Sequence, residues 1–348
     1  MIHKPNEFQA LKRTSLRLLD HFCNKSIHSD DLLDDYVLSL VSDHLSSSYK
    51  AIEDHTTGDK LNDFQKINLK KFDSSDYFSE FLNPIIDLHD LVNSSFSDIF
   101  DIFCIHGSIS SLDYKTGWSD LDTFAVVNKH IVFSSSGLLE LREAVKKINK
   151  ISKEICSLQH HGVNLQTPFE LFHYDQSNLP LEIFKEFKVL TDDIDYIEVS
   201  YSGLENNSIK RLKTVLSFLT KAYQEGILKT HAYNNKYLES NYKNAHDGMY
   251  QFKYFLEQFT LLPALYLSSI NQFHYKKDAI AEIKKHLSSQ TTDFIDSISY
   301  IRSEWPSKEG LLYVPNKIPN WIREIIPSNY FEIGYQIANE ILLEIENR

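Results

Sequence analysis

Two carboxylates and a glycine-serine pair stand out as residues that could act together on a phosphate group. Gly107 and Ser108 end one apolar run, and Asp120 and Asp122 begin the next. Neighbouring carboxylates repel one another unless a cation lies between them, and hard oxygen ligands of this kind suit Mg²⁺. Glycine lets the backbone approach a phosphate closely, while serine offers a hydroxyl and an N–H. These are the groups that a metal-dependent phosphate site requires.

The order of these residues along the chain favours a site over two unrelated turns. The apolar runs 102–105 and 124–127 are rich in branched and aromatic residues and predict strands, and eleven residues separate Ser108 from Asp120. In a strand, alternate side chains share a face, so Asp120 and Asp122 are expected to point the same way. Either half alone could be an ordinary turn, because Gly, Ser and Asp are common there. Both halves, in order between two strands, favour the site.

The stretch from Phe103 to Asn128 resembles the signature of the nucleotidyltransferase fold superfamily, the DNA polymerase β-like group that includes the minimal and aminoglycoside-type enzymes. In that signature an apolar strand ends in Gly-Ser or Gly-Gly, and Asp-x-Asp or Asp-x-Glu follows within apolar residues after roughly nine to thirteen positions. Here the parts read IHGS, eleven residues and DLDTFAVV. The direct match covers about 25 of the 348 residues, and the helix and strands that follow extend it to about 100.

The resemblance implies transfer of a nucleoside monophosphate from a nucleoside triphosphate, with ATP as the expected donor and pyrophosphate as the product. The acceptor would be a hydroxyl on a small molecule or a protein. Asp120 and Asp122 would hold the Mg²⁺ ions that bridge the phosphates, and Gly107 and Ser108 would hold the triphosphate. The alternative is a catalytically inactive nucleotide-binding or partner-binding protein on the same fold, including an antitoxin-like one.

Members of this superfamily usually carry a third carboxylate on a neighbouring strand, where it helps to activate the acceptor. We predict Glu170 for this catalytic role, because it follows the third expected strand in the segment TPFELFHY. Asp175 is the second choice, and Asn164 occupies a place where relatives carry an acid. A glutamate in a strand is as often simply solvated. Without a third acid, the inactive alternative gains weight.

The pattern of apolar residues predicts an α+β fold with a small mixed sheet, flanking helical segments and a C-terminal helical domain. We expect an N-terminal helical segment over 1–98, the nucleotidyltransferase domain over 99–203 and the helical domain over 204–348. The last of these carries periodic apolar residues throughout.

Within the central domain, four segments have distinct patterns. Apolar residues from Leu138 to Ile155 recur at helical spacing, so an amphipathic helix is expected there. Strands are expected over 162–165 and 169–174, and a helix over 179–190. His160 and His161 precede the third strand, where adjacent side chains point to opposite faces, so we expect one to be buried and the other exposed.

Basic residues concentrate between positions 209 and 243, in a chain whose net charge is −12. One interpretation is a solvated helix face, the usual reason for a run of charge. The functional interpretation is that Lys213 and Lys221 reach the triphosphate from the helical domain, as basic residues do in similar enzymes.

Composition limits the partners that can be expected. The acidic balance, 48 Asp and Glu against 36 Lys and Arg, argues against an extended nucleic-acid surface, whereas a small anionic ligand held by metal ions remains compatible. The beginning of the chain lacks the apolar region of a signal peptide, and no apolar run reaches the roughly 20 residues of a membrane span. The three cysteines have no metal-ligand spacing. We therefore expect a cytoplasmic protein with no membrane partner.

Overall fold

The structure is a computed structural model of the 348-residue chain. It describes residues 5–24, 35–56, 64–77, 82–156, 162–172, 174, 179, 181–200, 207–229, 237–239, 248–311 and 317–347. The fold is mixed α+β, as predicted, and the chain separates into two compact units. Unit 1 contains residues 1–114, 119–175 and 181–203, and unit 2 contains residues 115–118, 176–180 and 204–348.

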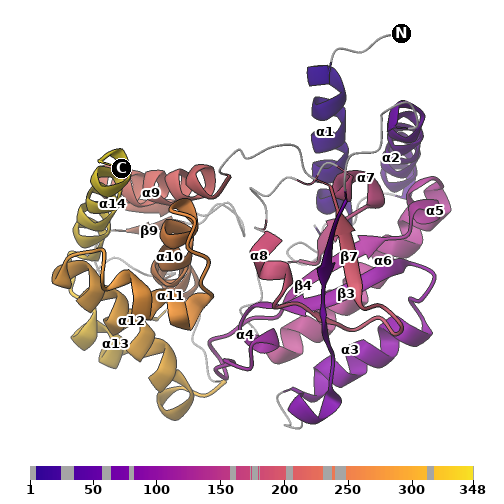
Figure 1. The fold of residues 1–348 in the computed structure, drawn as a ribbon. Helices are drawn as coiled ribbons and strands as arrows, with labels where there is room; N and C mark the ends of the chain where they lie inside the picture. Colours follow the sequence, from indigo (N-terminus) through magenta and orange to yellow (C-terminus); the bar gives the residue numbers. More distant parts are fainter. Residues whose placement is uncertain are drawn as a thin grey trace. The chain divides into compact units, whose positions relative to one another are not determined.

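A five-stranded mixed sheet forms the centre of unit 1 (Figure 1). Its strands, in spatial order, are β2 (Lys70–Lys71), β6 (Lys188–Val189), β3 (Phe100–His106), β4 (Asp122–Val127) and β5 (Asn164–Gln166). β3 runs antiparallel to β4 and β6, whereas β5 runs parallel to β4 and β2 runs parallel to β6. β4 is buried from Thr123 to Val127, as expected for an inner strand covered on both faces. A separate antiparallel pair joins β1 (Gln65–Asn68) to β7 (Tyr196–Val199).

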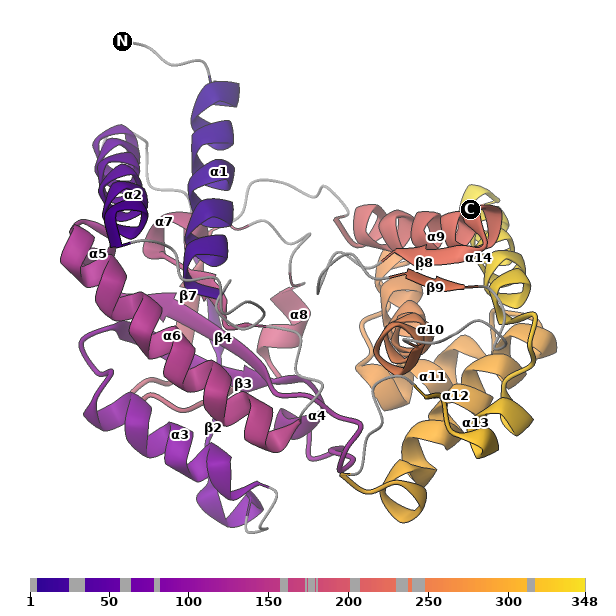
Figure 2. The same ribbon diagram turned by 180° about the vertical axis from the view of Figure 1, so that it is seen from behind.

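Helices cover this sheet, and the longest of those next to it is α6 (Ser135–Ile155) (Figure 2). The helix starts at the cap Ser134, whose hydroxyl accepts a hydrogen bond from the Gly137 N–H, and its buried residues follow the predicted helical spacing. α1 (Pro5–Asn24), α2 (Asp35–Thr56) and α3 (Asn83–Ser94) all pack on α6. The three N-terminal helices therefore share one core with the sheet, and no packing boundary falls at residue 98.

The remaining helical segments of unit 1 are short. They are the 3₁₀ helix at Ser74–Tyr77, α4 (Gly107–Ser110), α5 (Lys129–Val132), α7 (Pro168–Leu171) and α8 (Leu181–Phe184). Two predictions are wrong here. The strand expected over 169–174 is interrupted by α7, because Pro168 cannot donate to a ladder and Thr167 caps a helix. The helix expected over 179–190 ends at Phe184, and β6 follows.

In its described residues, unit 2 is helical apart from one short antiparallel strand pair. Its elements are α9 (Asn207–Glu225), β8 (Ile227–Lys229), β9 (Tyr237–Glu239), α10 (Gly248–Ser269), α11 (Lys276–Ile283), α12 (Ser289–Lys308), α13 (Asn320–Ile325) and α14 (Tyr330–Glu346). Aromatic rings fill its core: Phe255 lies 5.2 Å from Phe259 and 5.3 Å from Tyr330 between ring centroids. Among the described residues, no helix is long and apolar enough to cross a membrane.

Candidate nucleotide and metal site

The paired strands β3 and β4 bring the two halves of the sequence pattern to the same edge of the sheet. His106, the last residue of β3, pairs with Asp122, the first residue of β4. Gly107 follows His106 directly, so it also lies beside Asp122. The strands predicted at 102–105 and 124–127 are confirmed, and the antiparallel register joins residues that are about fifteen positions apart in the chain.

Gly107 and the carboxylate of Asp122 are in direct contact. A Cβ atom added to Gly107 would lie 2.1 Å from Asp122 Oδ2 and 3.0 Å from Asp122 Cγ. Gly107 also has φ +73°, in the left-handed region that side-chain-bearing residues rarely adopt. Two independent constraints therefore require glycine here. The contact joins the glycine half of the pattern to the carboxylate half.

Both aspartates are partly exposed, in contrast to the buried strand residues that follow them. β4 begins at Asp122, so Asp120 lies in the segment before the strand and the strand alternation that predicted a common face does not extend to it. What places Asp120 at this edge is its position two residues before Asp122 in the chain. Both aspartates are therefore in partial contact with solvent.

Ser108 lies in the single turn of α4 and is only 5% exposed. Its carbonyl accepts hydrogen bonds from the Asp113 N–H at 2.8 Å and from the Ser111 hydroxyl at 3.3 Å. The Ser108 N–H is in the first turn, where helix N–H groups have no partner within the helix. The backbone of Ser108, rather than its buried side chain, is therefore the part suited to contact a phosphate.

Asn164 is the first residue of β5, the strand beside β4. It pairs with Phe124, which lies two positions after Asp122 and so shares its face of the strand. Its side-chain oxygen accepts a hydrogen bond from Gln166 Nε2 at 3.1 Å. Continuing the same register puts Gly162 beside Asp122, so the first residue of β5 on this face carries an amide and lies one pair further along the strand.

Glu170 lies at the other end of these strands, and the structure does not bring it to the aspartates. Val126 pairs with Gln166, so the carboxyl end of β5 lies about 13 Å along β4 from Asp122. Glu170 follows that end as the third residue of α7, where its Oε2 accepts the Thr167 N–H at 2.8 Å in a capping box. It is 6% exposed, and its Oε1 has no hydrogen-bond partner among the described residues.

Burial raises the pKa of Glu170, against the opposing effects of the Thr167 hydroxyl and the charge of Lys12. Lys12, on α1, is 4% exposed, and burial lowers its pKa to about 8, with Glu170 acting in the opposite direction. The buried hydroxyl of Tyr49, on α2, also interacts with Glu170 and has its pKa raised by burial. This arrangement joins α7 to the two N-terminal helices, which is a structural role.

The other predicted site residues divide between unit 2 and the part outside the described residues. Lys213 and Lys221 are exposed on α9, which belongs to unit 2, whereas the aspartates belong to unit 1. Asp175 and the pair His160-His161 lie outside the described residues.

The donor set at the aspartate edge fits Mg²⁺, although it is small. In the part of the chain that the structure describes, no three His, Cys, Asp or Glu side chains converge on one point. Mg²⁺ needs no such cage, because it commonly binds through one or two carboxylates together with waters and substrate phosphates. Two partly exposed carboxylates beside a close-packed glycine satisfy that requirement.

One contact near this edge could not be predicted from local sequence. Asn24, the last residue of α1, hydrogen-bonds through its side chain to both backbone groups of Val163, the residue before Asn164. The two residues are 139 positions apart. An asparagine at a helix C-terminus is a common feature, so no sequence signal marks it.

The whole chain was compared with known proteins. Comparisons with models of protein families, with curated proteins and with solved structures gave no match. The functional assignment therefore depends on the residues and geometry described above.

Proposed function

We propose that the chain is a Mg²⁺-dependent nucleotidyltransferase whose site lies where β3 ends and β4 begins. The observation that carries this proposal is the contact between Gly107, at φ +73°, and the Asp122 carboxylate. Glycine adopts positive φ in many ordinary turns, but close packing of that glycine against a carboxylate is an additional feature that a turn alone does not require. A phosphate site does require it, because the backbone must come close to the ligand and the metal ligands must lie beside it.

In this proposal the residues of the β3–β4 edge have two roles, metal binding and triphosphate binding. Asp120 and Asp122 hold the metal ions, and the backbone N–H groups at Gly107 and Ser108 face the triphosphate. When bound, Mg²⁺ neutralises the phosphate charge and stabilises the attacking and leaving oxygens. The acceptor oxygen forms a bond to the α-phosphorus and its proton passes to solvent water, while the bond from that phosphorus to the oxygen bridging to the β-phosphate breaks and pyrophosphate leaves.

The acceptor in this proposal is a hydroxyl on a small molecule or a protein, and ATP is the proposed donor. A net charge of −12 disfavours a long polynucleotide, whose phosphates would be repelled.

A second candidate function is nucleotide or partner binding without transfer. The observation that favours it is Asn164, because the first residue of β5 on the face of Asp122 is an amide that cannot take up the proton of an acceptor hydroxyl. Binding would still use Asp120, Asp122 and Gly107. The two candidates therefore share a site and differ in whether a phosphate bond is broken.

The test measures pyrophosphate released from ATP, GTP, CTP and UTP with and without Mg²⁺, together with nucleotide binding by calorimetry. The double variant Asp120→Ala, Asp122→Ala should lose several kcal/mol of transition-state stabilisation, about 10³-fold in rate. The matched control replaces two exposed aspartates of the same unit, Asp87→Ala with Asp98→Ala, and should retain full activity.

Each outcome decides between the candidates. Mg²⁺-dependent release that the double variant abolishes supports transfer at this site. Binding that depends on the two aspartates, with no release in the presence of candidate acceptors, supports the second function. Release that the double variant leaves unchanged overturns the assignment to this edge, and the absence of both binding and release overturns both candidates.

A further inference from the structure

The C-terminal end of α1 replaces a neighbouring strand at the start of β5. β5 is an edge strand in the described sheet, so the backbone just before it is open on one side. Asn24 closes that side: its Nδ2 donates to the Val163 carbonyl at 3.0 Å, and its Oδ1 accepts the Val163 N–H at 3.1 Å. One amide side chain thus satisfies both the donor and the acceptor of one residue, as a paired strand would.

Close packing and further hydrogen bonds hold the Asn24 amide in one orientation. A Cβ atom added to Gly162 would lie 2.0 Å from Asn24 Oδ1, so the glycine leaves the space that the amide occupies. Asn24 Nδ2 also donates to Asp20 Oδ1 at 2.7 Å, and Asn149 of α6 approaches Asn24 Oδ1 at 3.5 Å. The amide therefore cannot rotate without losing several partners.

The hydrogen bonds from Asn24 fix the backbone just before β5, close to the site. Val163 is followed by Asn164, which pairs with Phe124 and lies on the face of Asp122. In a strand, a slip of one residue moves every side chain to the opposite face. The three-residue β5 offers few ladder bonds of its own to resist such a slip. Continuing the register of β5 with β4 puts Val163 beside Thr123 and Gly162 beside Asp122, so a fixed Val163 holds the beginning of β5 against the beginning of β4, which carries Asp122.

We infer that Asn24 is a positioning residue for nucleotidyl transfer and that α1 therefore helps to hold the site in its active geometry. This inference depends on the proposed function, because it concerns the geometry of the same edge. Asn24 acts through the backbone of Val163, which lies beside the start of β4, and does not itself contact the nucleotide or the metal.

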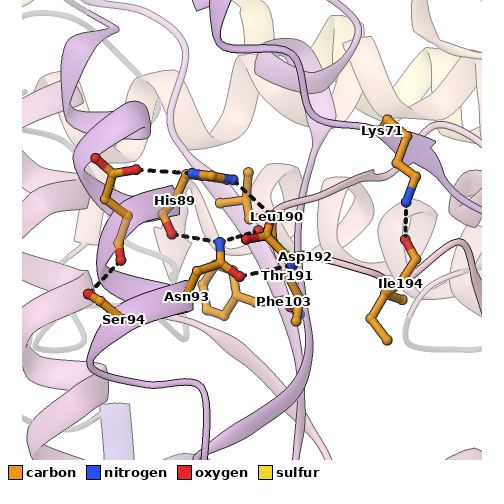
Figure 3. A network of polar contacts seen from close by, with 10 residues as sticks. Lys71, His89, Asn93, Ser94, Phe103, Leu190, Thr191, Asp192 and Ile194 are labelled. Atoms are coloured by element: carbon orange, nitrogen blue, oxygen red, sulfur yellow. Dashed lines mark hydrogen bonds and ion pairs between the residues drawn. The ribbon is translucent and has the colours of Figure 1, made fainter.

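The chain contains a matched control in Asn93 of α3, shown in Figure 3. Asn93 Nδ2 donates to the Leu190 carbonyl at 2.8 Å, and its Oδ1 accepts the Asp192 N–H at 2.8 Å. The Leu190 N–H bonds to the Phe103 carbonyl, in the middle of β3 and away from its Gly107 end. The same side chain thus makes the same kind of backbone contact at a place remote from the aspartates.

The experiment compares full-length Asn24→Ala with Asn93→Ala. Hydrogen exchange measured by mass spectrometry should accelerate at residues 162–166 in the Asn24 variant alone. Both variants should lower the melting temperature, because each loses at least three side-chain hydrogen bonds. At a temperature where both are folded, pyrophosphate release should fall at least about tenfold in Asn24→Ala and less than about twofold in Asn93→Ala.

A second variant leaves Asn24 in place. Gly162→Ala pushes a methyl group onto the Asn24 amide and should reproduce both the faster exchange and the loss of turnover, so the test does not depend on Asn24→Ala folding well. Equal turnover in the Asn24, Gly162 and Asn93 variants, with an active wild type, overturns the inference alone. A wild type without Mg²⁺-dependent release overturns the proposed transfer, and the positioning role falls with it.

Discussion

The two ends of the β4–β5 strand pair carry carboxylates in opposite environments. At the start of β4, Asp120 and Asp122 are partly exposed, and Asp122 lies against the backbone of Gly107. Beyond the end of β5, Glu170 is buried, accepts hydrogen bonds from Thr167 and has a raised pKa. The first environment leaves the carboxylates partly exposed to solvent. The second disfavours the charged form of the Glu170 carboxylate.

This difference shows that burial and hydrogen bonding decide whether a carboxylate is suited to bind a metal ion or has a structural role. A ligand for a metal must remain ionised and reachable, which suits the aspartate end. A carboxylate that closes a capping box is already engaged by the first turn of its helix, and a buried one resists ionisation. Glu170 therefore stabilises the junction of α7 with α1 and α2, although the sequence pattern marks it as a candidate for catalysis.

Substitution of Gly107 should have the largest effect, because it acts on the aspartate end directly. Gly107→Ala places a methyl group 2.1 Å from Asp122 Oδ2 and forces alanine to φ +73°. We expect pyrophosphate release to fall about 100-fold through displacement of the carboxylate. The free energy of unfolding should also fall by about 1–2 kcal/mol because of the backbone conformation, measured by urea denaturation.

The control for this variant is Gly310→Ala in α12's C-terminal turn. Gly310 has φ +60°, but the nearest atom to an added Cβ, the Pro306 carbonyl oxygen, is 3.9 Å away. It should therefore lose stability to a similar degree with no loss of turnover. Equal losses of turnover in both variants would contradict a specific role for the Gly107–Asp122 contact.

The pH dependence of the free energy of unfolding should reflect the buried groups around Glu170. Lys12 has a folded pKa of about 8 against an ordinary value of 10.5, so between these values the unfolded chain holds a proton that the folded chain has released. The contribution of Lys12 to stability should therefore rise with pH across this window, by about 3 kcal/mol in total, whereas the buried thiols of Cys23 and Cys104, whose pKa burial raises, contribute in the opposite direction. Lys12→Met should remove the rise, measured as the difference in unfolding free energy between pH 8 and pH 10. The same rise in the variant would show that another group is responsible.

Substitution of Glu170 should affect stability and leave the chemistry alone. Glu170→Ala removes the capping box and is expected to cost about 1–3 kcal/mol of unfolding free energy. Glu170→Gln keeps the hydrogen-bonding shape without the charge, so the cost should be smaller. Both variants should release pyrophosphate at the wild-type rate when folded. A loss of more than about tenfold in Glu170→Gln would instead assign Glu170 to catalysis.

Substitution of Asn164 should have the smallest effect on Mg²⁺ binding. It tests the difference between the two ends of the β4–β5 strand pair. Asn164→Asp adds a third carboxylate on the face of Asp122, and we expect about a tenfold gain in Mg²⁺ affinity, measured by calorimetry. Asn164→Ala is the control and should show no gain. Unchanged affinity in Asn164→Asp would mean that the side chain does not reach the metal.

Local patterns in the sequence were sufficient for the elements that contain them. The apolar runs around Gly107 and Asp122 predict β3 and β4, and the periodic residues from Leu138 to Ile155 predict α6. Each signal is contained within one element, because strand and helix periodicities depend on neighbouring residues. The Thr167–Glu170 capping box reads as T-x-x-E after β5, a local signal for the beginning of a helix where a strand is expected over 169–174.

The sequence by itself therefore determined which residues could bind a phosphate and a metal, and the α+β class that contains them. Only the tertiary structure decided which carboxylates share an edge, because strand register and the direction of β5 depend on contacts between distant segments. Burial separated Asp122 from Glu170, and burial is a property of the assembled core. The contact of Asn24 with Val163 has the same origin, since 139 residues lie between its partners and no local pattern spans them.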